Sequence, residues 1–330
     1  MLKRKSKRVL SIVLAVAMIV GLFPIAAFAE EGGLPATPVD QNTESVSTEL
    51  PKADEYGVIT LTEDVTMDTV VSVQSANTID LNGHTLSVLR LDSYTDLTIR
   101  DTSNATNGVL TSSGDITCVV WGGHSVTLES GTITNTNENG TTIFNLGTFT
   151  MNDGVISGDT VVYNTAKNGD NLVEGNIVCN INGGKVEVGT WGIVALGEGL
   201  DESGEANNDK VTVNITNGEI IGTDDCQAIA TNASGGAYAG FTINISGGMI
   251  DGGDEGCGMY LPAIGITNIS GGTVTGAQGI RICAGELNIT GGTIQGTALS
   301  DGSDLIAGGS GGTTGAIVVG KANSGYVGNI

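Results

Sequence analysis

The chain repeats a short motif near its end, as Ile245-Ser-Gly-Gly-Met-Ile250, Ile269-Ser-Gly-Gly-Thr-Val274 and Ile289-Thr-Gly-Gly-Thr-Ile294. In each copy two apolar residues stand five positions apart, with small polar residues and glycine between them. Glycine here predicts a turn, because a side chain would clash or strain the backbone. Earlier copies are Leu128–Ile133, Met151–Ile156, Ile181–Val186 and Ile215–Ile220, and Leu81–Leu86 is a still earlier one with His84 in the glycine position.

A further residue, usually apolar, stands two positions before each copy, for example Phe149 and Ile243. Apolar residues at period two are typical of a β-strand with one buried face. A second family of apolar runs, such as Thr160-Val161-Val162-Tyr163, lies between the glycine turns. Because so short a repeat cannot bury its own apolar face, strands of successive copies must stack at ~4.8 Å. The pattern predicts an all-β fold, a right-handed parallel β-helix (solenoid) of about nine or ten coils over residues 57–330.

One polar position recurs between the two apolar positions of the first strand. It is occupied by asparagine in consecutive copies: Asn180, Asn214, Asn244, Asn268 and Asn288. Equivalent asparagines on stacked strands can hydrogen-bond to one another along the stack. We expect this column to stabilise the fold and not to form a site.

The Asn-Ile-Ser/Thr-Gly-Gly-Thr-Val/Ile motifs, together with the segment Ile79–Leu86, resemble secreted bacterial right-handed β-helix repeat proteins, which have the pectate-lyase-like fold. The resemblance covers roughly residues 57–330. It implies a fold and an extracellular location, and it leaves the activity open because this fold carries many functions. Members of the group include polysaccharide lyases, glycoside hydrolases and large surface adhesins.

The first 29 residues are expected to be a secretory signal peptide. Met1–Arg8 carries Lys3, Arg4, Lys5, Lys7 and Arg8, an apolar run follows over 9–23, and Ala27-Phe28-Ala29 is an A-x-A cleavage site. Cleavage after Ala29 would release a secreted or cell-surface protein without a membrane span. The alternative is a membrane anchor that stays in place.

The two ends of the remaining chain differ from the repeats. Residues 30–56 contain Pro35, Pro38 and Pro51 and lack an apolar period, which predicts a flexible leader or linker. The final segment, 325–330, matches the lead-in of an earlier coil at 173–177. We therefore expect the parallel β-helix to be truncated at its C-terminal end, with further repeats or a wall anchor in the parent protein.

Charge limits the kinds of partner. Without the signal peptide the chain keeps 13 − 5 = 8 basic residues against 36 acidic ones, a formal net charge of −28. Such a chain repels nucleic acid and anionic membranes, whereas it attracts Ca²⁺ and basic partners. No nucleic acid is expected among its ligands.

Acidic residues cluster before two strands of neighbouring coils, as Asp224, Asp225, Asp254 and Glu255, and Arg281 follows one coil later. Stacked carboxylates could hold Ca²⁺ through oxygen ligands. Asp225, Glu255 and Arg281 are also the candidate catalytic residues of a lyase or a glycosidase, which needs carboxyl groups at a fixed separation. The simpler interpretation is a set of solvated turn residues, and no cofactor other than Ca²⁺ is indicated.

Aromatic residues and cysteines complete the candidates. Trp121, Trp191 and Tyr260 could stack on sugar rings, or they could be buried inside the coil. Counting back 12 residues from Ile133 and from Ile156 places Trp121 and Phe144 in one register. The five cysteines are predicted to be core thiols, although Cys226 and Cys257 begin the same strand in neighbouring coils and could pair.

Two functions remain open from the sequence. The first is a non-catalytic secreted or cell-surface module for adhesion or glycan binding, with an extracellular polysaccharide, surface glycan or protein as its partner. The alternative is a polysaccharide lyase or glycoside hydrolase that uses acidic residues on the β-helix face. The first is favoured, because an enzyme needs several convergent charged residues and the repeats offer few.

Overall fold

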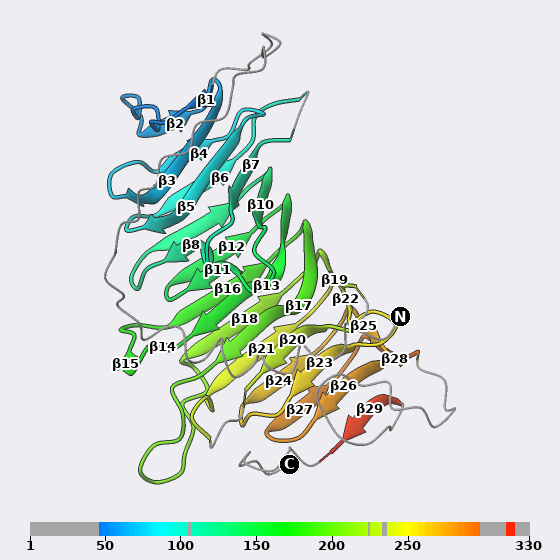
Figure 1. Cartoon of the computed structure of the whole chain (residues 1–330). Helices are drawn as coiled ribbons and strands as arrows, with labels where there is room; N and C mark the ends of the chain where they lie inside the picture. The colour runs from blue at the N-terminus through cyan, green and yellow to red at the C-terminus, as the bar shows by residue number, and fades with distance from the viewer. Residues whose placement is uncertain (1–45, 105–106, 224, 233–235, 298–314, 321–330) are drawn as a thin grey trace, which may run out of the picture.

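The computed structural model describes residues 46–104, 107–223, 225–232, 236–297 and 315–320. Within these ranges the chain forms β-strands and no helix, and the strands stack into one elongated solenoid (Figure 1). Neighbouring strands of both large sheets run parallel, as β16 and β18 do. The predicted all-β parallel β-helix is confirmed.

The first strand of each coil belongs to a ten-stranded sheet, which we call the first ladder. Its strands are β2 (Val58–Thr60), β4 (Thr78–Asp80), β6 (Leu97–Arg100), β9 (Ser125–Leu128), β12 (Thr148–Met151), β16 (Ile177–Ile181), β18 (Val211–Ile215), β21 (Phe241–Ile245), β24 (Ile266–Ile269) and β27 (Glu286–Ile289).

The remaining large sheet folds around a corner and forms a second and a third ladder. The second contains β1 (Val46–Ser47), β7 (Val109–Ser112), β10 (Thr132–Asn135), β19 (Glu219–Gly222), β22 (Met249–Asp251), β25 (Thr273–Gly276) and β28 (Thr293–Gly296). The third contains β8 (Ile116–Val120), β11 (Thr141–Asn145), β20 (Gln227–Thr231), β23 (Cys257–Leu261), β26 (Gln278–Ile282) and β29 (Gly315–Val319). Four long strands run through both ladders: β3 (Asp64–Val73), β5 (Thr85–Ser93), β13 (Val155–Thr165) and β17 (Lys185–Leu196).

The core runs along the inside of the solenoid. In the coil formed by β16 and β17, Ile181, Val186 and Ile193 come from the first, second and third ladders, and each is 0% exposed. All three belong to one continuous core cluster. Full burial of one such side chain contributes roughly 1.5–3 kcal/mol. The stacked apolar positions therefore supply the main driving force for coil-on-coil packing.

The asparagine column lies on the outward face of the first ladder, in register from β16 to β27. Each side-chain amide donates to the amide oxygen one coil earlier, as Asn244 Nδ2 does to Asn214 Oδ1 at 2.9 Å. Asn180 extends the column to the hydroxyl of Thr150 at 3.2 Å. The predicted side-chain hydrogen bonds are confirmed.

The turn after the first ladder needs glycine for a measurable reason. Gly272 has a φ of +79°, in the left-handed region that disfavours side chains. A Cβ built on it would lie 2.7 Å from the carbonyl oxygen of Gly247 in the previous coil. Coil spacing and backbone conformation thus both select glycine here.

Insertions project between the third and the first ladder in two successive coils. The antiparallel hairpin of β14 (Lys167–Asn168) and β15 (Asn171–Leu172) follows β13, and a longer loop over 197–210 follows β17 (Figure 1). The 197–210 loop is joined to residues 236–240 by backbone hydrogen bonds such as Gly197 N to Tyr238 O at 3.0 Å.

The predicted signal peptide (1–29), most of the 30–56 leader and the final segment at 325–330 lie outside the described residues. Within the described ranges, no helix has the length and apolar character needed to cross a membrane.

Candidate functional site

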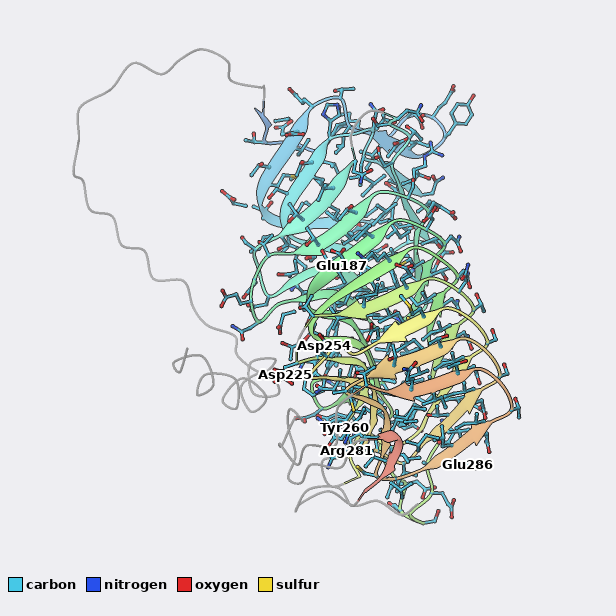
Figure 2. The ribbon with its side chains drawn as sticks, turned by 90° about the vertical axis from the view of Figure 1, so that its right-hand side faces the viewer. Glu187, Asp225, Asp254, Tyr260, Arg281 and Glu286 are labelled. Atoms are coloured by element: carbon cyan, nitrogen blue, oxygen red, sulfur yellow. The ribbon has the colours of Figure 1, made fainter. Side chains whose placement is uncertain are left out.

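The acidic candidates lie at the corner before the third ladder. Because Gln227 of β20 pairs with Cys257 of β23, Asp225 and Glu255 occupy equivalent positions on neighbouring coils, two residues before these partners. Asp225 and Asp254 lie close together at one edge of the solenoid (Figure 2). Asp224 lies outside the described residues. Among the described residues, no group of three or more His, Cys, Asp or Glu side chains is placed to hold a metal ion.

Arg281 occupies a different part of the same ladder. It pairs with Tyr260, three positions after Gln278 and Cys257 pair. About five positions thus separate it from Glu255 along the strand direction, or up to ~16 Å for extended chain. Arg281 lies over the Tyr260 ring, with its guanidinium carbon 5.6 Å from the ring centroid, and is 6% exposed (Figure 2). The register does not bring Arg281 opposite Asp225 and Glu255, and their catalytic role stays a prediction.

All five cysteines are free thiols and buried, as expected for core residues. Cys257 is opposite Gln227, one position after Cys226, so the two cysteines are not in register. Their sulfur atoms contact different groups: Cys226 Sγ lies 3.3 Å from Gly252 O, and Cys257 Sγ lies 3.5 Å from Gln278 Oε1. Burial raises the pKa of both thiols to about 12.

The three aromatic candidates do not form one surface. Trp191 lies at the start of its third-ladder segment, opposite Thr160 and Gln227. Trp121 directly follows β8, at the opposite end of the strand direction from Trp191. Tyr260 lies five strands along from β8, about 24 Å at the usual strand spacing. The register predicted for Trp121 and Phe144 is wrong, because Phe144 pairs with Val119.

The structure instead places aromatic rings together on the outward face of the third ladder's first coils. We call Tyr94, Val119, Trp121, Phe144 and Tyr163 the aromatic surface. The rings of Tyr94 and Trp121 stack with centroids 5.5 Å apart and planes 8° from parallel. Those of Phe144 and Tyr163 also stack at 5.5 Å, with planes 10° apart. Four successive coils contribute, through β5, β8, β11 and β13.

Strand alternation explains why these residues face outward. Cys118 and Val120 of β8 belong to the interior core, so Val119 between them must lie on the other face. Val119 and Phe144 form a second, smaller hydrophobic cluster with Leu146, against which Trp121 and Tyr163 pack. Tyr94 is 39% exposed, and Trp121 and Tyr163 are partly exposed. The surface therefore has a buried base and rings that reach solvent.

Charges beside the aromatic surface are neutralised locally. Asp92 pairs with Val119 in register and accepts two hydrogen bonds from Arg90, from Nε at 2.7 Å and from Nη2 at 2.9 Å. The Asp92 hydrogen bond raises the pKa of Arg90. Burial raises the pKa of the Tyr163 phenol well above its ordinary value, with a further contribution from Tyr238. The phenol is therefore neutral at physiological pH.

The hairpin flanks the aromatic surface. Val173, just after β15, packs against its buried base. A Cβ on Gly122, the residue after Trp121, would meet Val173 Cγ1 at 3.2 Å. Lys210, only 9% exposed, donates from Nζ to the carbonyl oxygens of Val173 at 2.6 Å and Gly175 at 2.7 Å. This lysine fixes the exit of the hairpin.

Tyr94 is the site residue that sequence reasoning missed. Its signal is visible once the third ladder is aligned: Leu91, Asp92 and Ser93 pair with Cys118, Val119 and Val120, so Tyr94 and Trp121 are the next residues of each strand. The repeat motif belongs to the first ladder and carries no information on this register.

Comparisons with protein-family models, with curated proteins and with solved structures gave no match to this chain. The chemistry of the aromatic surface is therefore inferred from its own geometry.

Proposed function

We propose that the protein is a secreted or cell-surface carbohydrate-binding module that acts without catalysis, in adhesion or glycan binding. The observation that carries the proposal is the aromatic surface, with two stacked ring pairs on four successive coils. Aromatic rings with polar ends suit sugar ligands, which have apolar C–H faces and polar edges.

A regular solenoid supports this function physically. The rings are held by strands whose backbones are hydrogen-bonded on both sides, as β11 is between β8 and β13. A rigid platform loses little conformational entropy when a ligand binds. The signal peptide expected from the sequence would deliver such a module to an extracellular glycan.

The enzyme alternative receives less support. A lyase or hydrolase needs acid and base groups at a fixed separation around the scissile bond. The candidate carboxylates and Arg281 lie at separate positions along the third ladder. The aromatic surface itself contributes two tyrosines and no carboxylate among its five residues.

Tryptophan fluorescence provides a direct test, because the chain has two tryptophans. The Trp191→Phe variant leaves Trp121 as the single reporter, at the aromatic surface. Titration with soluble polysaccharides should change its emission, and Tyr94→Ala should weaken binding about twofold to tenfold through loss of one stacked ring, worth roughly 0.5–1.5 kcal/mol.

Ile289→Ala is the control. This residue is 42% exposed but lies in β27, the last strand of the first ladder. Its removal should leave binding unchanged. Equal losses in the two variants, or binding that survives Tyr94→Ala, would assign any glycan affinity to another surface.

A further inference from the structure

We propose that Lys167 and Tyr238 form a binding position for a single anionic group, a carboxylate or a sulfate, on a glycan that is otherwise neutral. Both residues belong to insertions between the third and the first ladder, beside the aromatic surface. The inference rests on the proposed function and names a charged substituent of its ligand.

Two insertions from different coils bring these side chains together. Lys167 begins the hairpin after β13, and Tyr238 lies between β20 and β21, two coils later. The Lys167 ammonium lies over the Tyr238 ring, 6.0 Å from its centroid, and donates to the carbonyl oxygen of Ala237 at 3.1 Å. A cation over an aromatic face is attracted by the charge distribution of the ring. Two contacts therefore define where the ammonium lies.

This position adjoins the aromatic surface. Tyr163 precedes Lys167 by four residues along the chain, and the Tyr238 phenol is near enough to contribute to the raised pKa of Tyr163. Val173, at the other end of the hairpin, packs against the buried base of the surface. One ligand can therefore contact both the rings and the ammonium.

The strand register gives the distance that such a ligand must cover. Trp121 follows Val120, which pairs with Asn145 of β11, and Asn145 pairs in turn with Asn164 of β13. The strand before Trp121 and the strand before Lys167 are thus two spacings apart, or ~9.6 Å. The anionic group consequently belongs to a different part of the glycan from the sugar that stacks on Trp121.

Lys167 retains hydrogen-bonding capacity for an anion. An ammonium has three N–H donors, and Lys167 uses one of them on Ala237 in a hydrogen bond that is exposed to solvent. Among the residues that the structure describes, no carboxylate forms an ion pair with Lys167, whereas Arg90, Arg100 and Lys185 each have one. A carboxylate or sulfate can therefore accept a charge-assisted hydrogen bond from Lys167.

The charge of the whole chain selects a ligand with few anionic groups. A formal net charge of −23 repels polyanions over the whole molecule. The other basic side chain beside the rings, Arg90, is already paired with Asp92 at 2.7 Å. One ammonium can compensate one anionic group, and each additional group on the ligand meets repulsion. The best ligand thus carries an isolated charge on a neutral chain.

The test is isothermal titration calorimetry of the full chain with four probes of equal length. Three are xylo-oligosaccharides, unsubstituted, with one glucuronate or with one sulfate ester, and the fourth is an oligogalacturonide. We expect a singly charged probe to bind about threefold to fivefold more tightly than the neutral one, as for an exposed ion pair, and more tightly than the oligogalacturonide. The preferred anion distinguishes a carboxylate ligand from a sulfate ligand.

Variants assign this preference to one side chain. Lys167→Met should abolish it and leave the affinity for the neutral probe unchanged, whereas Lys167→Arg should retain it. Lys185→Met is the matched control, because it changes the net charge equally but removes a cation that is paired with Glu187 at 2.8 Å. This variant should bind all four probes as the native chain does.

The outcomes separate the inference from the function on which it rests. If neutral and singly charged probes bind equally and Tyr94→Ala weakens both, the anion position is wrong and the glycan-binding function stands. Equal losses in Lys167→Met and Lys185→Met, or tightest binding of the oligogalacturonide, would also overturn the anion position. If no probe binds while circular dichroism shows an intact β-fold, both the inference and the proposed function fail.

Discussion

At the scale of single residues, hydrogen bonds between equivalent side chains tie the coils together. Asn244 donates to Asn214 and accepts from Asn268, both at 2.9 Å, so it takes part in two interactions between coils. Each asparagine thereby fixes the amide orientation of the next. All the side-chain amides of the column therefore point the same way, because the sequence repeats asparagine at this position in each coil.

Replacing Asn244 by alanine should remove both hydrogen bonds. Each contributes about 0.5–1.5 kcal/mol, so the free energy of unfolding should fall by roughly 1–3 kcal/mol in urea denaturation. Asn288→Ala is the control, because Asn288 is exposed and water can replace its hydrogen bonds to Asn268 at 3.1 Å and to Glu286 Oε1 at 2.8 Å. A loss at Asn288 as large as that at Asn244 would show that the column does not act through its interior bonds.

Buried thiols predict a pH dependence of stability. Burial raises the pKa of Cys118 and Cys179 from 9.0 to about 12. In the unfolded chain these thiols ionise near their ordinary pKa, so between pH 9 and about 12 the unfolded state releases protons that the folded state keeps. The free energy of unfolding should fall across this window, by up to ~1.4 kcal/mol per pH unit and thiol, and be unaffected by these groups below it.

The comparison variant carries Cys118→Val and Cys179→Val, which keep the apolar character of both positions. Urea denaturation at about pH 8 and about pH 10 should show a smaller loss of stability in the variant than in the native chain. Identical losses would mean that the thiols ionise as readily in the folded protein as in the unfolded one.

At the scale of elements, the hairpin of β14 and β15 illustrates how an insertion can shape a surface without disturbing the ladders. Val173 packs on the buried base of the aromatic surface, and the Lys210 ammonium holds the backbone on either side of Glu174. Hydrogen bonds from a charged donor contribute about 1.5–3 kcal/mol each. One lysine from the next coil therefore sets the position of the whole flank.

Lys210→Met should release that flank while keeping most of the buried methylene stem. Amide hydrogen exchange over residues 166–176 should become at least tenfold faster, because the local opening free energy falls by more than about 1.4 kcal/mol. Lys167→Met is the control on the same hairpin, since its ammonium makes a single 3.1 Å bond to Ala237 O at an exposed position. Unchanged exchange in Lys210→Met would show that the Lys210 hydrogen bonds do not hold the hairpin in place.

At the scale of the whole molecule, the sequence predicts the ladders far better than the corners. The first ladder has a strict motif, and its register was predictable from asparagine and isoleucine spacing. The corner after the third ladder varies in length: six positions separate Val120 from Val126, and four separate their partners Asn145 and Phe149. Counting residues across this corner therefore misplaced Trp121 by two positions and hid its neighbour Tyr94.

The candidate site was predictable only in part for the same physical reason. Aromatic side chains and carboxylates are visible in the sequence. Which of them lie side by side on neighbouring coils depends on the lengths of the corners, and the pattern of buried residues does not constrain those lengths. Cys226 and Cys257 show this on a smaller scale, since one residue of difference places them out of register. Features confined to one ladder follow from sequence, whereas surfaces that depend on a corner require the structure.

The most direct test of the account is a crystal structure of the protein with a soluble oligosaccharide. The account predicts a sugar ring over the stacked pair of Tyr94 and Trp121. A sugar bound beside Asp225, Asp254 and Glu255, with the aromatic surface empty, would contradict it and favour an enzyme.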